Sequence, residues 1–363
     1  MQFAFKVSRQ YLQQKQEENT LKNFWYACEF SSAVTDQPKQ IVMLNQRFVL
    51  YRNSQGQIVA LKDRCPHRGA ALSLGWVENS CIRCPYHGWK FQADGQCIEI
   101  PSNAPEKPIP KRASVDSYPV KEKYGFVWLF YGNLSETERP SLPTFPKYMV
   151  ETMRPVYDEG IDNANYARLM EANLDFTHVI AVHRKSFGQR IPINKTINYK
   201  VDKYDWGAVA KVNYKSLGKS KSFLNFLLGG RPELKTKLTL YLPNVTLAEI
   251  SIGRGNRFDI KFGILVAHLP IDDNNTLVKR VLYRNILPIP WLDGFFRKLD
   301  HKLAQEDTVV VATLDSQLMP KISEELHVAA DALDITFRQF LQKHLTASSS
   351  NFGRNIAFSP ESD

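Results

Sequence analysis

The stretch Cys65-Pro66-His67-Arg68 and its counterpart Cys84-Pro85-Tyr86-His87-Gly88-Trp89 decide the fold of this chain. Each stretch places a histidine two or three positions after a cysteine, and sixteen residues separate His67 from Cys84. Together they offer two thiolates and two imidazoles in two separate clamps. With five cysteines and eight histidines among 363 residues, such a pairing is rarely met by chance. We therefore predict that the two stretches bind one metal cofactor.

Two cysteines and two histidines in this spacing are typical of a Rieske [2Fe-2S] cluster, in which the cysteines hold one iron and the histidines the other. The alternative is tetrahedral zinc, which also accepts two cysteines and two histidines. The C-x-H spacing is a poor match to the usual zinc spacings, and Gly88-Trp89 suits a tight turn over a cluster. We predict that Cys65, His67, Cys84 and His87 bind a [2Fe-2S] cluster.

Composition limits the class of protein. The chain is 43% hydrophobic, which is ordinary for one large or two medium soluble domains. It contains no apolar run of membrane-spanning length, and its first residues lack the apolar region of a signal peptide, so we expect a cytoplasmic location. The net charge of +10 comes without any nucleic-acid motif, so no nucleic-acid partner is expected.

Part of the positive charge surrounds the two clamps, at Lys62, Arg64, Arg68, Arg83 and Lys90. A basic rim at the point where electrons enter would steer an acidic ferredoxin toward the cluster. The same residues could equally serve solubility alone, and the sequence does not separate these two interpretations.

Turn signals and hydrophobic periodicity predict an α+β chain with two domains. An N-terminal extension (1–20) precedes an all-β domain (21–135) with strands at 40–44, 47–51, 58–62 and 125–131, and a linker follows (136–150). The second domain (151–345) is expected to hold helices at 163–182, 291–314 and 323–344 and strands within 200–214, 237–252 and 258–282. The tail 346–363 is rich in serine and asparagine and is expected to be disordered.

A second metal site is predicted within Asp175-Phe176-Thr177-His178-Val179-Ile180-Ala181-Val182-His183. On near-helical backbone this spacing brings both imidazoles to one side, with Asp175 a turn earlier. His178 and His183, joined by a distant carboxylate, would form the facial triad of a mononuclear non-haem Fe(II) oxygenase, which leaves coordination positions open for O₂.

These motifs resemble those of the oxygenase (alpha) component of Rieske non-haem iron oxygenases, and the likeness extends from about Asn23 to His344. The resemblance implies a Rieske domain joined to a helix-grip (START-like) catalytic domain with an antiparallel sheet, in a head-to-tail homotrimer. Ferredoxin and its reductase would donate electrons. The resemblance also implies that Asp175 links His178 of its own chain to His87 of the next chain. In such enzymes the cluster and the iron of one chain lie too far apart for useful electron transfer.

The third iron ligand implied by the resemblance is Asp307, in Gln305-Glu306-Asp307-Thr308. Glu306, Asp300 and Asp315 are the competing carboxylates. One departure from the family pattern is Ala172, which stands where many members have an asparagine, so a contact near the iron is either missing or supplied by Asn173.

The main competing class is a Rieske electron carrier, which has an additional disulfide at positions matching Ala70 and Tyr86. Neither residue is a cysteine, so we expect a monooxygenase that hydroxylates or oxidatively demethylates a large, cyclic, hydrophobic substrate. A weaker likeness to the chlorophyllide a and pheophorbide a oxygenases, carried by Asn23-Phe24-Trp25-Tyr26 and Leu282-Tyr283-Arg284, suggests a tetrapyrrole such as chlorophyllide a. A redox sensor without turnover is the other alternative.

Two apolar stretches flanked by cations, 223–228 and 286–292, bear on the substrate and on localisation. They could line a hydrophobic pocket or contact an anionic membrane surface, and they could equally be ordinary core segments.

Overall fold

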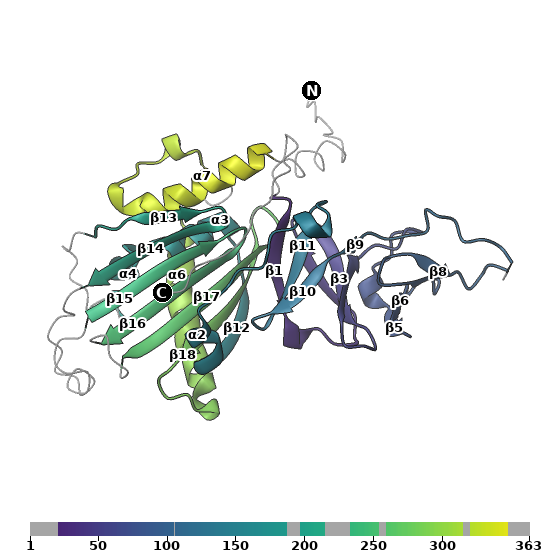
Figure 1. The fold of residues 1–363 in the computed structure, drawn as a ribbon, viewed down its shortest axis with the longest axis horizontal. Helices are drawn as coiled ribbons and strands as arrows, with labels where there is room; N and C mark the ends of the chain where they lie inside the picture. The colour runs from purple at the N-terminus through teal and green to yellow at the C-terminus, as the bar shows by residue number, and fades with distance from the viewer. Residues whose placement is uncertain are drawn as a thin grey trace, which may run out of the picture.

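The computed structural model describes residues 21–104, 106–186, 197–214, 233–253, 259–314 and 320–347. The predicted extension 1–20, the apolar stretch 223–228, Asp315 and the tail from 348 onward lie outside these residues. A group of small sheets and one large sheet lie side by side along the long axis of the molecule (Figure 1). Among the described helices, none has the length and apolar character needed to cross a membrane.

Three small antiparallel sheets build the N-terminal unit. The first sheet joins β1 (Phe24–Phe30), β11 (Phe126–Tyr131) and β10 (Val120–Lys123). The second joins β2 (Lys39–Met43), β3 (Gln46–Arg52), β4 (Ile58–Lys62) and β9 (Ser117–Tyr118). The third joins β5 (Trp76–Glu78), β6 (Cys81–Arg83), β7 (Lys90–Phe91) and β8 (Cys97–Glu99), and it forms the far tip of the molecule (Figure 1).

Two-residue turns set the register of three of these strand pairs. The turns are Leu44-Asn45, Asn79-Ser80 and Tyr124-Gly125, and every one of the six residues has a positive φ, between 51° and 78°. Positive φ at both central positions is the signature of the type I′ turn, whose twist matches that of the strands it joins. The turns therefore fix which faces of the strands point into the core.

The C-terminal unit is built on a single antiparallel sheet of seven strands. Their order is β12 (Arg154–Asp162), β18 (Thr276–Arg284), β17 (Ile260–Pro270), β16 (Val245–Gly253), β15 (Glu233–Tyr241), β14 (Gly207–Tyr214) and β13 (Val201–Tyr204). Apart from β12, neighbouring strands of the sheet are also neighbours in sequence. The stretches 200–214, 237–252 and 258–282, which were expected to form strands, therefore correspond to the hairpins β13–β14, β15–β16 and β17–β18.

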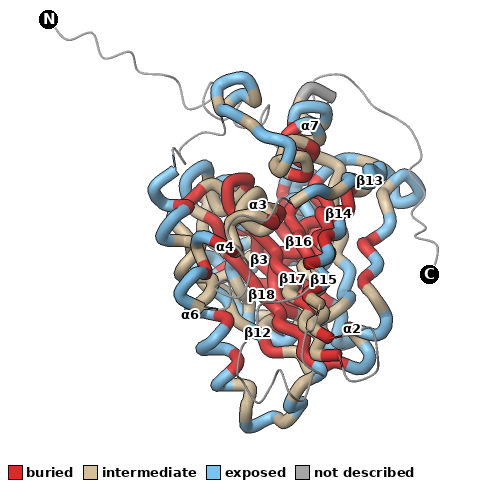
Figure 2. The backbone as a smooth tube through the Cα atoms, turned by 90° about the vertical axis from the view of Figure 1, so that its left-hand side faces the viewer, coloured by how far each residue is buried: buried red, intermediate tan, exposed pale blue. Residues whose placement is uncertain are grey.

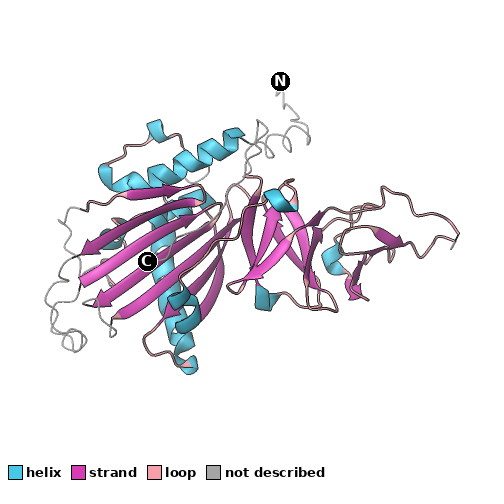
Figure 3. Cartoon of the chain, in the orientation of Figure 1, coloured by secondary structure: helices cyan, strands magenta, loops and turns pink. Residues whose placement is uncertain are grey.

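Helices cover one face of this sheet (Figures 1 and 3). They are α3 (Tyr166–Leu174), α4 (His178–Ala181), α6 (Asp293–Val311) and α7 (Ala332–Ala347). Val311 of α6 packs against Val266 and Val278 of the sheet. On the opposite face, α2 (Lys147–Thr152) and β1 pack through Met149 and Trp25. The most deeply buried residues accordingly follow the central strands (Figure 2).

Two buried side-chain contacts are among those that tie the N-terminal unit to the large sheet. The side-chain amide of Asn244 accepts a hydrogen bond from the N–H of Ala27 (3.3 Å) and donates one to its carbonyl (3.2 Å), at the point where a bulge interrupts the pairing of β1 with β11. Glu29, one position past the bulge, forms a buried ion pair with Lys279 of β18. The relative orientation of the two units is thus fixed by buried polar contacts.

The predicted α+β fold, with an all-β N-terminal domain and a large antiparallel sheet behind it, is confirmed. Two helix predictions need correction. Residues 163–182 form two helices with a break between them, and residues 322–324 and 329–331 form 3₁₀ turns before α7 begins.

Candidate metal centres

The two clamps adopt the same backbone turn. In the first, Gly69 N–H donates to the carbonyl of Cys65 (2.9 Å), and Cys65 N–H donates to the carbonyl of Ala70 (2.8 Å). In the second, Gly88 N–H donates to Cys84 (3.0 Å), and Cys84 N–H to Trp89 (2.9 Å). The two glycines have φ of 79° and 71°, a conformation that side chains disfavour. The glycines therefore let each loop fold back over its own cysteine.

The cysteines of the clamps are buried and the histidines are exposed. Cys65 and Cys84 have 2% and 1% of their surface exposed, and they lie in a cluster of apolar side chains. The rings of His67 and His87 lie outside, 4.6 Å apart, and His67 stacks on Trp89 with an angle of 4° between the rings. Burial raises the pKa of the Cys65 thiol to about 12, so a thiolate at this position needs a bound cation. Two inner sulfurs and two outer nitrogens fit a [2Fe-2S] group of the Rieske type.

The second candidate centre begins where α3 ends. Asp175 leaves the helix with extended backbone (φ −82°, ψ 128°). Its carboxylate accepts hydrogen bonds from the N–H and the hydroxyl of Thr177 (2.7 Å for the hydroxyl) and from the N–H of His178 (3.0 Å), so it caps α4. This break in the helix, which periodicity alone did not predict, turns His178 and His183 toward one point.

His178, His183 and Asp307 form the group of potential ligands found among the described residues, with ligand atoms all within 4.8 Å of one another. Asp307 Oδ1 lies 3.2 Å from His183 Nε2 and 3.6 Å from His178 Nε2. His178 Nδ1 lies 2.9 Å from the carbonyl of Asp175, and His183 Nδ1 lies 2.8 Å from Glu306 Oε2. Both partners can only accept, so both Nδ1 atoms carry the hydrogen.

This tautomer leaves a lone pair on each Nε2, facing a carboxylate oxygen. Asp307 Oδ1 is buried and makes no hydrogen bond of regular geometry to any described residue. Three electron-pair donors converging on one point are unfavourable unless a positive charge lies between them. That charge is either a metal ion or a second proton on His183, whose pKa is lowered by burial but raised overall by Asp307 and Glu306. The donor set of two imidazoles and one carboxylate therefore fits mononuclear Fe(II).

Comparison with known proteins agrees with both centres. Residues 24–119 match the family model of the Rieske [2Fe-2S] domain. Residues 163–347, just over half of the chain, match the vanillate O-demethylase oxygenase C-terminal domain. The chain belongs to the Rieske non-haem iron oxygenases. Its predicted family, and the cofactors implied by that family, are thus confirmed.

Individual relatives of this Rieske oxygenase match it over part of their length. The toluene-4-sulfonate monooxygenase system iron-sulfur subunit TsaM1 of Comamonas testosteroni is 34% identical over 174 residues, which cover 46% of this chain and 48% of that protein. The chloroplastic chlorophyllide a oxygenase of Chlamydomonas reinhardtii is 32% identical over 193 residues, 51% of this chain and 28% of that protein. The chain therefore spans about half or less of the length of these curated relatives.

A solved structure shares the whole fold. Dicamba monooxygenase bound to 3,6-dichlorosalicylic acid superposes with a TM-score of 0.78 at 22% identity, covering 92% of this chain and 99% of that one. Both the small sheets and the large sheet of this Rieske oxygenase thus follow an arrangement seen in a crystal.

The competing carboxylates of this Rieske oxygenase have other partners. Asp300 is buried and pairs with Arg280 (3.1 Å). Glu306 contacts His183 from the side opposite Asp307, and Ser186 donates a hydrogen bond to the same Glu306 oxygen (3.1 Å). Sequence reasoning treated Glu306 only as a rival ligand. Its adjacency to Asp307 was the one available signal for a supporting role.

The contact left open by Ala172 is not supplied by its neighbour. The amide of Asn173 donates to the carbonyl of Leu169 within its own helix (2.9 Å). Ala172 itself packs against the apolar cluster that contains Val311. Neither side chain offers a polar group to the metal centre of this Rieske oxygenase.

The basic rim around the clamps is smaller than the sequence suggested. Lys62 pairs with Asp116 (2.9 Å), and Arg83 pairs with Glu99 (2.7 Å) and also with Glu78. Lys90 is buried, 3.8 Å from the same Glu78. Only Arg64 and Arg68 of the predicted five are exposed without a described carboxylate partner. The rim is therefore a weak basis for steering an acidic protein.

An apolar strip lies on the helix-covered face of the large sheet of this Rieske oxygenase. It consists of Ile250, Ile252, Phe262 and Ile264, all half-buried. Phe262, Ile264 and Val266 stand at every second position of β17, so their side chains share one face of the sheet. Ile264 also packs against the cluster that contains Val311 of α6. Val311 follows Asp307 by one helical turn. The strip therefore faces the same side of the sheet as the carboxylate ligand.

Proposed function

We propose that the chain is the oxygenase component of a monooxygenase that uses electrons and O₂ to hydroxylate or oxidatively demethylate a hydrophobic substrate. The observation that carries this proposal is the convergence of His178, His183 and Asp307 in a chain that also has the Rieske clamps. Cys65, His67, Cys84 and His87 would hold the [2Fe-2S] cluster. Fe(II) held by the triad would supply the open coordination positions at which O₂ is activated.

Electrons would cross between subunits of a homotrimer. Within one chain the clamps lie in the far tip of the molecule. The helix α4 lies at the end of the large sheet that is away from this tip (Figure 1). His87 is exposed, so it is accessible to a neighbouring chain. Asp175 would bridge to it, because its carboxylate stands next to His178 and is only partly buried. Its Oδ2 lies 3.9 Å from His178 Nδ1, so within the chain the link to that ring runs through the Asp175 carbonyl.

Exposed apolar side chains support such a head-to-tail contact. The tip exposes 78% of Leu74 and 58% of Tyr86, and the C-terminal end of α6 exposes 69% of Val309 and 44% of Val310. The two patches lie on different surfaces of one chain, which is what a heterologous interface requires. The α6 patch lies within one helical turn of Asp307 and beyond the residues 297–305, so a tip seated there would bring the cluster to the triad.

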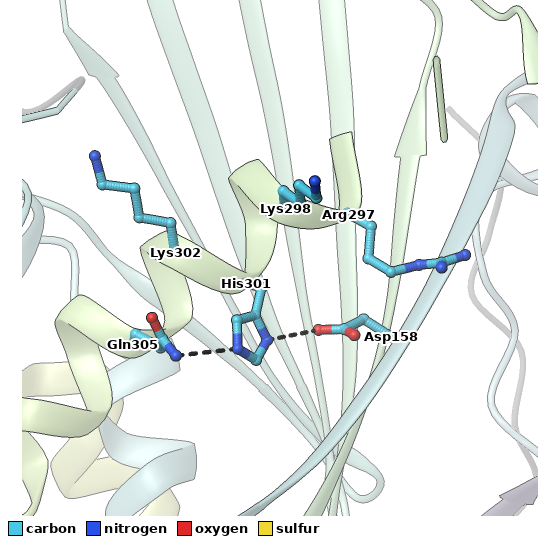
Figure 4. A pocket seen from close by; sticks show the side chains of 6 residues that line it. All are labelled: Asp158, Arg297, Lys298, His301, Lys302 and Gln305. Atoms are coloured by element: carbon cyan, nitrogen blue, oxygen red, sulfur yellow. Dashed lines mark hydrogen bonds and ion pairs between the residues drawn. The ribbon is translucent and has the colours of Figure 1, made fainter. Parts of the chain in front are cut away.

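The electron donor would be a ferredoxin with its reductase. A shallow groove of about 230 Å³ on α6 is lined by Arg297, Lys298, His301, Lys302, Gln305 and Asp158 (Figure 4). Its three cations are exposed, and none has a described carboxylate within ion-pairing distance. His301 already lies between Asp158 (3.2 Å) and Gln305 (3.1 Å), which leaves the cations for an acidic partner.

The substrate would be large, cyclic and apolar, with a chlorophyll-type tetrapyrrole such as chlorophyllide a as one candidate. The apolar strip supports an apolar substrate, and the likeness to chlorophyllide a oxygenase supports the tetrapyrrole. The exposed residues Leu287 and Trp291, 51% and 78% exposed, leave room for peripheral contact with a membrane that carries such pigments.

Iron content and O₂ consumption test this proposal. Anaerobically reconstituted protein should hold about three irons per chain, two in the cluster and one in the triad. Reduced protein should consume O₂ when an apolar substrate from a panel of chlorophyllides, phenolic ethers and sterols is added. A content of about two irons would instead favour the alternative, a Rieske electron carrier or redox sensor.

A further inference from the structure

We propose that Glu306 is a positioning residue that holds His183 from the side opposite the metal and gives the centre a second negative charge. This inference rests on the proposed iron site. Glu306 Oε2 lies 2.8 Å from His183 Nδ1, while His183 Nε2 faces Asp307 Oδ1 at 3.2 Å. One imidazole is therefore flanked at both ring nitrogens by two consecutive residues of α6, and the hydrogen bond that orients it is accepted by Glu306.

The two histidines of the centre are oriented by different means. His178 Nδ1 bonds the carbonyl of Asp175, a neutral acceptor within its own loop. His183 Nδ1 bonds a carboxylate that is 123 positions away in the sequence. A carboxylate acceptor strengthens the hydrogen bond and makes the opposite ring nitrogen a better electron-pair donor. His183 should therefore be the stronger of the two imidazole ligands.

Glu306 is itself held in place. Ser186 Oγ lies 3.1 Å from the same Oε2 that accepts the His183 hydrogen bond and 3.0 Å from the carbonyl of His183, so its single hydrogen is shared between two acceptors. His183 has only 4% of its surface exposed. The carboxylate, the hydroxyl and the imidazole thus form a small closed network in which the ring has little freedom to rotate.

The network changes the charge of the centre. A facial triad with one carboxylate around a divalent cation has a net charge of +1, whereas Asp307 and Glu306 together bring it to zero. A site with more negative charge binds a divalent cation more tightly and favours the oxidised over the reduced ion. We therefore expect Glu306 to raise the affinity for Fe(II) and to lower the Fe(III)/Fe(II) potential.

Fe(II) affinity of the cluster-loaded protein tests the inference, by competition with a chromophoric chelator under anaerobic conditions. Glu306→Ala should bind Fe(II) 10-fold to 100-fold more weakly than wild type, the range for loss of such a partner. Glu306→Gln keeps an acceptor but no charge, so its affinity should fall between the two. Ser186→Ala should cost less than Glu306→Ala. The control Glu151→Gln alters an exposed carboxylate on α2 and should change nothing.

Cobalt substitution gives a second readout that a merely structural role would not move. The visible ligand-field bands of Co(II) in the triad should shift in Glu306→Gln while the cluster absorbance and the unfolding temperature stay at wild-type values. Unchanged Fe(II) affinity and an unchanged Co(II) spectrum in both Glu306 variants would overturn the inference alone. Wild-type protein that binds no iron beyond its cluster would overturn the proposed function as well.

Discussion

The carboxylate of Glu29 on β1 pairs with the ammonium of Lys279 on β18, across the boundary between the two domains. Both side chains are buried, with 2% and 1% of their surface exposed, and Lys279 also contacts Glu159 on β12. Lys39 reaches the second oxygen of Glu29 at 2.9 Å. The Lys279 side chain further lies over the ring of Phe30, 4.8 Å from its centre. One buried lysine thus links the N-terminal unit to the large sheet of the C-terminal unit.

Removing this lysine should be costly. Lys279→Met would leave Glu29 as a buried charge with Lys39 as its only remaining cation, and breaking a buried pair typically costs about 3–5 kcal/mol. Denaturant unfolding followed by circular dichroism would measure the loss. Lys200→Met, at an exposed lysine, is the matched control. A loss no larger than that of the control would show that the pair does not stabilise the domain junction.

Stability should also depend on pH through Glu29. Burial by itself would raise the pKa of Glu29, but the nearby Lys279 ammonium outweighs it and lowers that pKa below its ordinary value. A lowered pKa in the folded state means that the stabilisation is complete above the unfolded pKa, about 4.3, and disappears as the pH falls through the folded pKa. In Glu29→Gln the unfolding free energy should therefore fall less steeply between about pH 5 and pH 3 than in wild type. Parallel curves would contradict this.

Asp175→Asn should separate metal binding from electron transfer. Asparagine keeps one oxygen that can cap α4, so both centres should assemble, with a stability loss of about 1 kcal/mol or less. Reoxidation of the reduced cluster in a single turnover should slow sharply, because the bridging carboxylate is gone. Asp202→Asn, at an exposed residue of β13, is the control. Transfer at the wild-type rate in Asp175→Asn would refute the bridge.

Loss of the carboxylate ligand should empty only one centre. Asp307→Ala should reduce the iron content from about three to about two per chain while the visible absorption of the cluster stays unchanged. The same substitution at Asp300 should leave the iron content unchanged and instead destabilise α6, because Asp300 pairs with Arg280. If Asp300→Ala lost the third iron and Asp307→Ala did not, the ligand assignment would be wrong.

The groove on α6 should determine how well an acidic donor reduces the cluster. Reversing the charge at Lys298 and Lys302 together should slow reduction by an acidic ferredoxin and weaken the dependence of that rate on ionic strength. Lys200→Glu changes the net charge by two units elsewhere and should have a much smaller effect. Stopped-flow measurements at two salt concentrations would give the rate of cluster reduction for wild type, the double variant and Lys200→Glu. If this rate depended equally on ionic strength in all three proteins, docking at the groove would be excluded.

The sequence could predict those parts of the site whose residues lie close together in the chain. Cys65 and His67 belong to one turn, as do Cys84 and His87, so the spacing itself encodes the clamp. Asp307 was reached only by resemblance, because no local pattern relates α6 to α4. The role of Glu306 depends on how α6 docks, since it appears only when His183 is placed beside it.

The same reasoning explains one wrong helix prediction and one question that the sequence left open. The break at Asp175 depends on a side chain that caps the next helix, a choice that hydrophobic periodicity does not record. The basic rim was overestimated because Glu78, Glu99 and Asp116 reach Arg83 and Lys62 through strand pairing. Charges far apart in sequence neutralise one another only once the sheets have formed.

The matching turns of the two clamps have a consequence for assembly. One clamp lies between β4 and β5 and the other between β6 and β7, and in a Rieske cluster each would give one cysteine to one iron and one histidine to the other. Each iron is therefore a cross-link between two segments of chain, much as a disulfide would be. Loss of the metal should release both segments together, so binding of iron would complete the folding of the tip. A tip that holds only one of the two irons should therefore not accumulate.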